Sequence, residues 1–325
     1  MISLEKFLTP TQKELYALVR KMYKGRTICC KKSFVLVYGE APVMLVAHMD
    51  TVHNERVKHI CTTQDGNILM SPQGIGGDDR CGVYALVNAY EAAEKKPWLL
   101  FTCDEEIGGR GADNFCRKYE DGKLPKELAD LKLIIEIDRR GSEDAVYYSC
   151  DNKEFEDYIT SKGFKTASGS FSDISYIAPD LGVAAVNLSS GYYNAHTQHE
   201  YINRQHIDAV IAKVNEIVAE AAKPDFPKYE YIEKKVELVR RAFPYASPSN
   251  WWKHDKDDDD GVVTLHTNIP KDLPVKYKAM YDELLDYYEM GDLEEYRKMY
   301  GDAVIEEMYQ SDIMPQYTDG WGDLK

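Results

Sequence analysis

Short, continuous apolar runs alternate with amphipathic segments along the first two thirds of this chain, and this alternation limits how it can fold. A run without polar interruptions suits a strand that is covered on both faces, whereas a half-exposed strand alternates apolar and polar residues. The long segment that starts at Asn203 instead has the spacing of a helix with one apolar face. The pattern predicts an α/β domain with a mostly parallel central sheet sandwiched by helices. The apolar runs are VMLVAH (43–48), WLLFTC (98–103), LKLIIEID (131–138) and VAAVNLS (183–189).

Local signals refine this expectation near the N-terminus. Thr9, Pro10 and Gln12 are typical of a helix start with a capping box. The strands expected in SFVLVYG (33–39) and VMLVAH (43–48) are separated only by EAP, which predicts a hairpin.

The composition changes after the expected α/β domain, which we place at residues 1–222. Residues 223–325 contain 14 Lys and Arg against 23 Asp and Glu. A linker-like stretch, KPDFPKYEYI, is followed by an acidic run and by short segments with helix-capping residues. We therefore expect residues 223–325 to form a linker and a small, acidic, mainly helical extension of unknown role.

The overall composition excludes several classes of protein. A net charge of −15 and a pI near 5.1 disfavour nucleic acid as a partner. No stretch approaches the roughly 20 apolar residues of a membrane span, and the N-terminus lacks the apolar centre of a secretory signal. The seven cysteines lack CxxC spacing, which argues against a disulfide framework and a cysteine-built zinc site. These features predict a cytoplasmic protein.

The first apolar run ends in His48 and Asp50, and this ending calls for an explanation. Residues i and i+2 of a strand point to the same side, so the two side chains can touch. A carboxylate placed in this way fixes the tautomer of a metal-binding histidine. Taken alone, however, the pair is more typical of a hydrogen-bonded histidine in a protein core.

Four further signals of this kind occur, and they change the balance in favour of a metal site. They follow a strand or precede a helix, and the carboxyl ends of strands in an open α/β sheet face a common crevice. Carboxylates gathered there would repel one another unless cations were bound. Two divalent ions would balance three carboxylate ligands, neutral imidazoles would complete the coordination, and a remaining carboxylate would serve as general base. The signals are Asp78 and Asp79 in GIGGDDRCG, Glu105 and Glu106 in FTCDEEIGG, Asp138 in IIEIDRRG, and His196 and His199 in YYNAHTQHEYI.

In order along the chain, these segments resemble the five motifs of the co-catalytic di-zinc metallopeptidase clan. This clan includes leucyl-type aminopeptidases, tripeptidase T and the acetylornithine-deacetylase relatives, and its fold is of the zinc-exopeptidase type. The segments are His48-Met49-Asp50-Thr51-Val52, Gly77-Asp78-Asp79-Arg80, Glu105-Glu106-Ile107-Gly108, Asp138 and His196-Thr197-Gln198-His199-Glu200.

The resemblance implies a role for each matching residue. His48 and Asp138 would bind one metal ion, Glu106 and His196 the other, and Asp78 would bridge the two. Glu105 would be the general base and Asp50 would orient His48. The ions are expected to be Zn²⁺, with Mn²⁺ and Co²⁺ as alternatives. The resemblance also implies a cis peptide between Asp78 and Asp79. Two details of the match are less simple. His199 is an alternative to His196 as the histidine ligand, and Arg80 stands where relatives often have lysine.

The spacing of the motifs favours an aminopeptidase that acts on short peptides. Only 57 residues separate Asp138 from His196, whereas deacylase relatives insert a lid domain there. Asp173 could meet a substrate amine or cap a loop. Arg110, Arg139 and Arg140 could instead hold a substrate carboxylate, which keeps an N-acyl-amino-acid or dipeptide amidohydrolase as the alternative. A glutaminyl-cyclase-like enzyme and a non-enzymatic binding protein are further alternatives. An oligomer is compatible with the sequence.

Overall fold

The computed structural model describes residues 2–234, apart from Lys31 and Asn54, and isolated residues between 272 and 305. The chain divides into two compact units, residues 1–238 and 239–325. The predicted acidic, helical extension falls mainly outside the described residues, so its structure and the domain boundary at residue 222 stay predictions.

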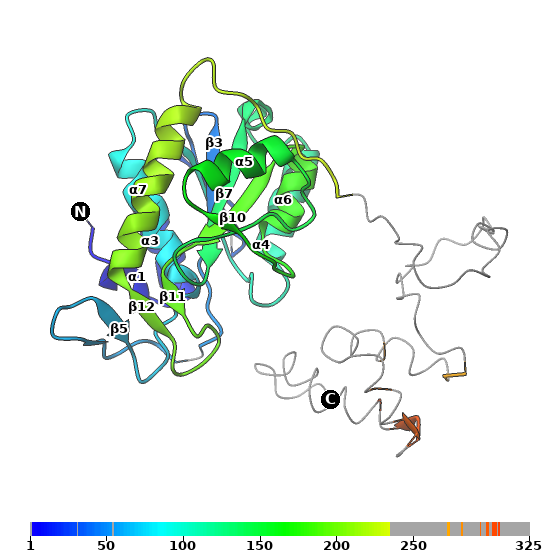
Figure 1. The fold of residues 1–325 in the computed structure, drawn as a ribbon. Helices are drawn as coiled ribbons and strands as arrows, with labels where there is room; N and C mark the ends of the chain where they lie inside the picture. The colour runs from blue at the N-terminus through cyan, green and yellow to red at the C-terminus, as the bar shows by residue number, and fades with distance from the viewer. Residues whose placement is uncertain are drawn as a thin grey trace. The chain divides into compact units, whose positions relative to one another are not determined.

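An eight-stranded sheet forms the centre of the first unit, in the order β1-β2-β6-β3-β7-β10-β8-β9 (Figure 1). Its four middle strands are parallel, because β3 pairs in parallel with β6 and β7, and β10 in parallel with β7. This confirms the predicted α/β fold. The strands are β1 (Thr27–Cys30), β2 (Phe34–Val37), β3 (Val43–His48), β6 (Trp98–Thr102), β7 (Leu133–Arg139), β8 (Asp144–Val146), β9 (Lys165–Thr166) and β10 (Ala185–Ser189).

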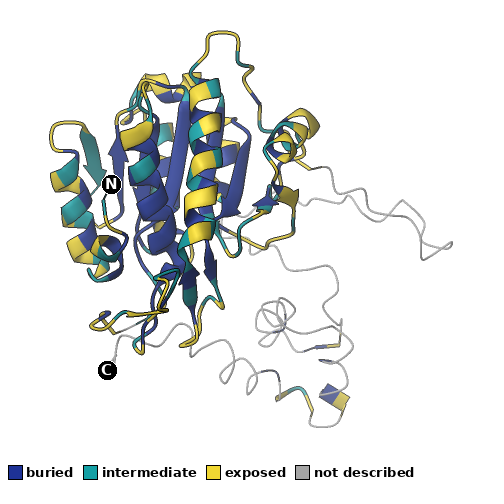
Figure 2. Ribbon diagram, turned by 60° about the vertical axis from the view of Figure 1, so that its left-hand side comes forward, coloured by how far each residue is buried: buried dark blue, intermediate teal, exposed yellow. Residues whose placement is uncertain are grey.

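Helices cover both faces of this sheet. Successive residues of each buried strand point to opposite sides, so each strand packs against the helices on both faces. Leu45 and Ile135 pack with α2, α3, α5 and α7, whereas Met44 and Ile134 pack with α4, α6 and η1. Figure 2 shows buried strands between helices whose outer faces are exposed. The helices are α1 (Glu5–Leu8), α2 (Gln12–Met22), α3 (Gly77–Ala92), α4 (Arg110–Glu120), the 3₁₀ helix η1 (Lys126–Asp130), α5 (Lys153–Ser161), α6 (Ile174–Leu181) and α7 (Arg204–Ala221).

A small second sheet, in the order β11-β12-β5-β4, lies at one end of the unit. It carries the loop between β11 and β12, which contains His196. Its strands are β4 (Cys61–Thr62), β5 (Ile68–Met70), β11 (Tyr192–Tyr193) and β12 (Tyr201–Asn203).

The predicted hairpin between β2 and β3 is wrong. In the sheet, β6 lies between these two strands and pairs antiparallel with β2. The connection crosses the start of β6, where the amides of Glu40 and Ala41 both donate to the carbonyl of Lys96. A side chain at Gly39 would lie only 2.3 Å from the amide nitrogen of Trp98, so the crossing requires glycine. Two strands that are adjacent in sequence are thus separated by a third from much later in the chain.

The predicted start of the first long helix is also corrected. Thr11, not Thr9, is the N-cap of α2, and its capping box is completed by Glu14 instead of Gln12. Thr9 closes the short helix α1, which the sequence analysis did not anticipate. The predicted apolar face of α7 is confirmed, with Ile207, Val210 and Val214 among its buried residues.

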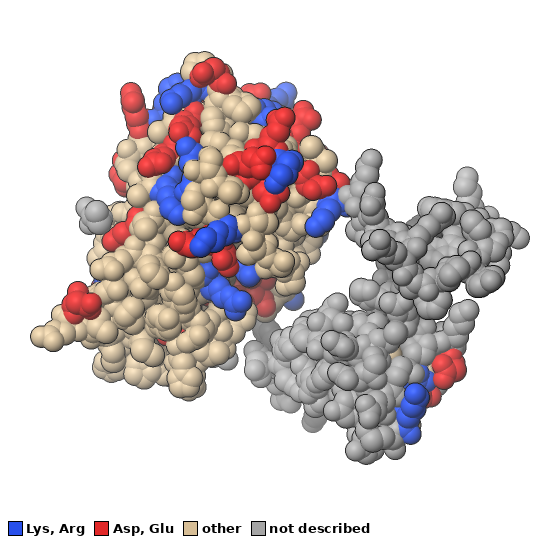
Figure 3. Space-filling model, in the orientation of Figure 1, with Lys and Arg blue, Asp and Glu red and all other residues tan. Residues whose placement is uncertain are grey.

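Charged side chains of both signs lie on the surface of the described residues (Figure 3). On the face seen in Figure 3, acidic and basic side chains of the described residues are intermingled instead of forming a basic stripe. None of the helices in the described part of the chain combines the length and apolar character that a membrane span requires.

Candidate metal centre

The predicted ligands lie together at the carboxyl ends of the central parallel strands. His48 is the last residue of β3, Asp138 lies near the end of β7, and Glu106 follows β6. Asp78 stands in the first turn of α3, and the peptide bond that joins it to the following Asp79 is in the cis form. His196 approaches from the loop between β11 and β12. Parallel pairing thus brings segments that are far apart in sequence to one crevice.

One half of the centre is formed around His48. Its Nε2 atom lies 3.2 Å from Oδ1 of Asp78 and 3.6 Å from Oδ1 of Asp138. On the other side of the ring, Nδ1 lies 3.3 Å from Oδ1 of Asp50. The imidazole therefore presents Nε2 to the carboxylates while Asp50 orients it from behind.

The other half is formed around His196. Its Nε2 atom lies 3.3 Å from Oδ2 of Asp78 and 3.1 Å from Oε2 of Glu106. The two oxygens of Asp78 therefore face two different histidine–carboxylate pairs. This is the arrangement expected of a carboxylate that bridges two metal ions.

The electrostatics of the pocket fit cations at these positions. Burial, together with the charge of Asp78, raises the pKa of Asp138 to about 8. Hydrogen bonds that His196 donates to Asp78 and Glu106 raise its pKa to about 11. Oε1 of Glu106 is sealed from solvent and has no hydrogen-bond partner among the described residues. Buried, mutually repelling carboxylates with spare acceptor atoms would be relieved by bound divalent ions.

Donor atoms within the cluster are also close enough for metal binding. Those of His48, Asp78 and Glu106 lie within 4.8 Å of one another, as do those of His48, Asp79 and Asp138. Asp79 was not assigned a role from the sequence. Its side chain is fully buried, and one oxygen accepts a hydrogen bond from the amide of Gly82 while the other has no partner.

Glu105 lies beside this cluster, with Oε2 3.9 Å from Nε2 of His48. Burial, and then the nearby charge of Asp138, raises the pKa of Glu105 to about 9. Asp50 holds the loop, since its two oxygens accept hydrogen bonds from the amides of Glu105 and Glu106 at 3.1 and 3.0 Å. Asp50 thus connects the orientation of His48 to the position of the candidate base.

The sequence did not indicate that the buried carboxylate of Glu200 holds the backbone at Asp78. One oxygen of Glu200 accepts a hydrogen bond from the amide of Asp78 at 2.9 Å, and the other accepts from the amide of Gly76 at 3.0 Å. His53 Nε2 lies 2.8 Å from the same carboxylate. The signal for Glu200 was its place in the last motif, but nothing in the sequence indicated His53 as its partner.

A second buried network supports Asp138. Its amide donates to the side chain of Asn187 at 2.9 Å, and the Tyr192 hydroxyl lies 3.4 Å from its Oδ1. Two positions earlier on β7, Glu136 is fully buried and accepts a hydrogen bond from the Ser172 hydroxyl. Sequence reasoning passed over Glu136, because a single carboxylate inside an apolar strand has no distinctive spacing.

The remaining candidates take other positions. Asp173 is fully buried and accepts a hydrogen bond from Thr102, and it makes no side-chain cap of α6. Arg139 donates to the carbonyl of Ser168, while Arg110 and Arg140 are exposed. Of the two histidines in the last motif, His196 contacts the carboxylates. Within the described part of the chain, His199 makes hydrogen bonds through its backbone, where its carbonyl accepts from Asn194 and its amide donates to Thr197.

Comparison with known proteins was made at the levels of sequence and structure. No protein-family model and no curated protein matches the sequence. Among solved structures, a tripeptidase from Staphylococcus aureus matches with a TM-score of 0.51 at 15% identity, covering 67% of this chain and 97% of that one. The fold is that of the tripeptidases and aminopeptidases. The aminopeptidase PepT from Bacillus cereus has a TM-score of 0.51 at 14% identity, covering 68% of this chain and 100% of that one.

An archaeal aminopeptidase fits the same fold. The TET aminopeptidase from a marine-sediment Thaumarchaeota archaeon has a TM-score of 0.50 at 12% identity, covering 66% of this chain and 95% of that one. The predicted zinc-exopeptidase-like fold is therefore confirmed. At these identities the likeness establishes the aminopeptidase fold, and the activity has to be argued from the residues of this chain.

Proposed function

We propose that this protein is a two-metal hydrolase of peptide bonds, and specifically an aminopeptidase acting on short peptides. One observation carries the proposal: the two oxygens of Asp78 face separate histidine–carboxylate pairs. His48 and Asp138 would hold one ion, and Glu106 and His196 the other. The histidine and carboxylate donors suit Zn²⁺, and Mn²⁺ or Co²⁺ would be alternatives.

The protein's own groups supply the proton transfers. Two bound divalent ions would act as Lewis acids toward the scissile carbonyl and the attacking water. Glu105 would take a proton from this water at its carboxylate and return it to the departing amine. The raised pKa of Glu105 suits a group that must both accept and donate within one reaction cycle. Asp50 would keep Glu105 in place through the backbone amide.

The fold between the last two motifs supports an aminopeptidase over a deacylase. Residues between β7 and β10 form β8, α5, β9 and α6 of the same unit, so the described chain has no separate lid domain there. The exposed Arg110, which begins α4 just after the Glu105 loop, keeps the amidohydrolase as a second candidate because it could bind a carboxylate. All seven cysteines are unpaired, which supports a reducing, cytoplasmic location.

Metal analysis combined with a substrate panel tests the proposal. Purified protein would be loaded with Zn²⁺, Mn²⁺ or Co²⁺, and hydrolysis of amino-acyl anilides and tripeptides compared with that of N-acyl amino acids. We expect two ions per chain and a preference for substrates with a free α-amine. A preference for blocked substrates would favour the amidohydrolase, and one ion per chain or none would contradict the two-metal centre.

A further inference from the structure

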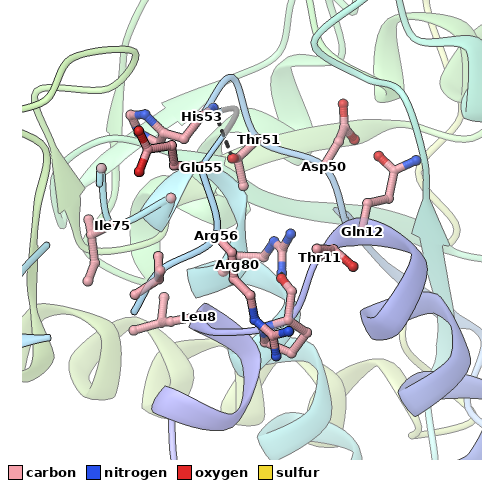
Figure 4. A pocket seen from close by; sticks show the side chains of 14 residues that line it. Leu8, Thr11, Gln12, Asp50, Thr51, His53, Glu55, Arg56, Ile75 and Arg80 are labelled. Carbon is pink, nitrogen blue, oxygen red and sulfur yellow. Dashed lines mark hydrogen bonds between the residues drawn. The ribbon is translucent and has the colours of Figure 1, made fainter. Parts of the chain in front are cut away.

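A hollow of about 230 Å³ lies beside the metal centre, between the loop after β3 and the segment that joins α1 to α2 (Figure 4). Asp50 and Thr51 form part of its wall, and Thr11 and Gln12 another part. None of the five predicted metal ligands lines it. The hollow is therefore separate from the crevice in which the proposed hydrolysis takes place, although Asp50 borders both.

Two arginines converge on one short loop at this hollow. Nη1 of Arg80 donates to the carbonyls of Phe7 and Pro10, both at 2.9 Å. Nε of Arg56 donates to the carbonyl of Thr9 at 3.0 Å. Both guanidinium groups carry a full positive charge at neutral pH and are fixed against the same few residues. Two guanidinium groups fixed this close together would be stabilised by more than one negative charge nearby.

The described protein groups supply only part of that charge. Glu14 pairs with Arg56 at 3.2 Å, but Arg80 has no carboxylate partner. The charges of Asp50 and Asp79 act on Arg80, yet neither carboxylate accepts a hydrogen bond from it. Asp50 is already engaged by His48 and by two backbone amides. Burying a charge without a paired counter-charge is costly, so the missing partner is expected to be a ligand.

Arg80 also keeps donors free. It is only 4% exposed, and its Nε is sealed without a partner. Its Nη2 atom has no hydrogen-bond partner in the described part of the chain and, unlike Nε, is not sealed from solvent. Because Arg80 lines the hollow, the free Nη2 is available to a group bound there.

The start of α2 adds a second source of positive potential. Thr11, the N-cap of this 11-residue helix, lies on the wall of the hollow. The capping box already uses the amides of Thr11 and Glu14, so only the other outward-pointing amides of this first turn favour an anion. In Figure 4 the labelled Arg56 and Arg80 lie next to Thr11, and Leu8 and Ile75 lie on the other side. With Val57, these two residues give the hollow an apolar wall.

We propose that this hollow binds a small organic carboxylate with an apolar body. The carboxylate would pair with Arg80 and Arg56 at the start of α2, and the body would contact Leu8, Val57 and Ile75. His53 and the exposed Glu55 complete the lining, but His53 is already bound to Glu200. The proposal does not depend on the proposed peptidase activity.

Calorimetric titration of the full-length, metal-loaded protein with 3-methylbutanoate tests this site. Arg56→Gln is the main variant, because Arg56 is half-exposed and its loss should leave the fold intact, whereas Arg80 is part of the core. Arg117→Gln, which removes an exposed arginine elsewhere, is the matched control. We expect saturable binding that weakens about 10-fold or more in Arg56→Gln and is unchanged in Arg117→Gln. The uncharged 3-methylbutanamide should not bind.

Two further titrations distinguish binding in the hollow from binding at the metal centre and from non-selective anion binding. Binding should persist after the metal ions are removed with a chelator. Binding that disappears with the metal and is unaffected by Arg56→Gln would place the carboxylate on the metal ions and overturn the proposal. Inorganic phosphate should bind more weakly than 3-methylbutanoate, and the reverse order would overturn the organic ligand. Absence of saturable binding in the wild type would overturn the site itself.

Discussion

Glu105 and its neighbour Glu106 show how two adjacent carboxylates are given different tasks. Oε2 of Glu106 faces His196 at 3.1 Å, whereas Glu105 lies beside His48 at 3.9 Å. The amides of both residues are held by Asp50, so the loop is fixed while the two side chains diverge. These positions fit the proposed roles of Glu106 as a metal ligand and Glu105 as the general base.

Replacing Glu105 tests this division of tasks. Glu105→Gln should lower kcat by about 10²–10⁴-fold, because the amide cannot accept the proton, while the metal content stays at the wild-type value. Steady-state kinetics and metal analysis would be compared with those of Glu127→Gln, an exposed glutamate on η1. Near-wild-type turnover in Glu105→Gln would exclude it as the base.

Glu200 acts at the same scale, through the backbone of a ligand. It accepts hydrogen bonds from the amides of Gly76 and Asp78 and contacts His53. Glu200→Gln would turn an amide donor toward these donors, so we expect metal affinity to fall about 10–100-fold. Metal competition titrations would measure this, with Glu143→Gln, an exposed glutamate paired to Lys165, as control. Unchanged affinity would show that the loop is held by other contacts.

At the scale of elements, the close approach of α3 to β7 positions Asp78 and Asp79. A Cβ at Gly82 would lie 2.2 Å from the carbonyl oxygen of Ile137 and 2.3 Å from Oδ2 of Asp79. The helix can start this close to the sheet only because residue 82 has no side chain. The ligand at the first turn of α3 therefore depends on a glycine one turn later.

Gly82→Ala should displace the start of α3 and weaken both the fold and the metal centre. Overpacking of this kind costs about 1–3 kcal/mol in the free energy of unfolding. Denaturant unfolding and metal titration would both be measured, with Glu91→Ala on the exposed side of the same helix as control. A variant with wild-type stability and metal affinity would contradict the role given to this contact.

Across the molecule as a whole, the candidate metal centre concentrates buried carboxylates whose charge is balanced either by protons or by bound ions. Burial raises the pKa of Asp138 to about 8 and that of Glu105 to about 9. In the unfolded chain both groups titrate near pH 4. The folded, metal-free protein thus holds protons that the unfolded chain has released. Its stability is then present at low pH and is lost as the pH rises through about 8 to 9.

The chelated protein should therefore have a lower Tm at pH 8.5 than at pH 6, and added divalent ions should raise the Tm more at pH 8.5. The lowered pKa values of Asp50 and Asp78 have the opposite effect, but only below about pH 4, outside this range. Thermal unfolding at both pH values, with and without Zn²⁺, would measure the difference. A metal effect that does not grow with pH would contradict the assignment of Asp138 as a ligand.

The α/β class and the five candidate metal ligands could be predicted from the sequence alone. Short, continuous apolar runs suit strands that are covered on both faces, and polar residues at the ends of such runs, as at His48 and Asp138, indicate a site at the carboxyl ends of the strands. The structure brings all five predicted ligands together. These features depend on local spacing, which the sequence contains directly.

Only the tertiary structure decided which elements are neighbours. It placed β6 between β2 and β3, turned the two oxygens of Asp78 toward different histidines, joined His53 to Glu200 and brought Arg56 beside Arg80. Each of these contacts joins segments that are far apart in the chain. Packing and the balance of buried charge across the whole unit select which segments meet. Neither can be predicted from the local spacing of apolar and polar residues.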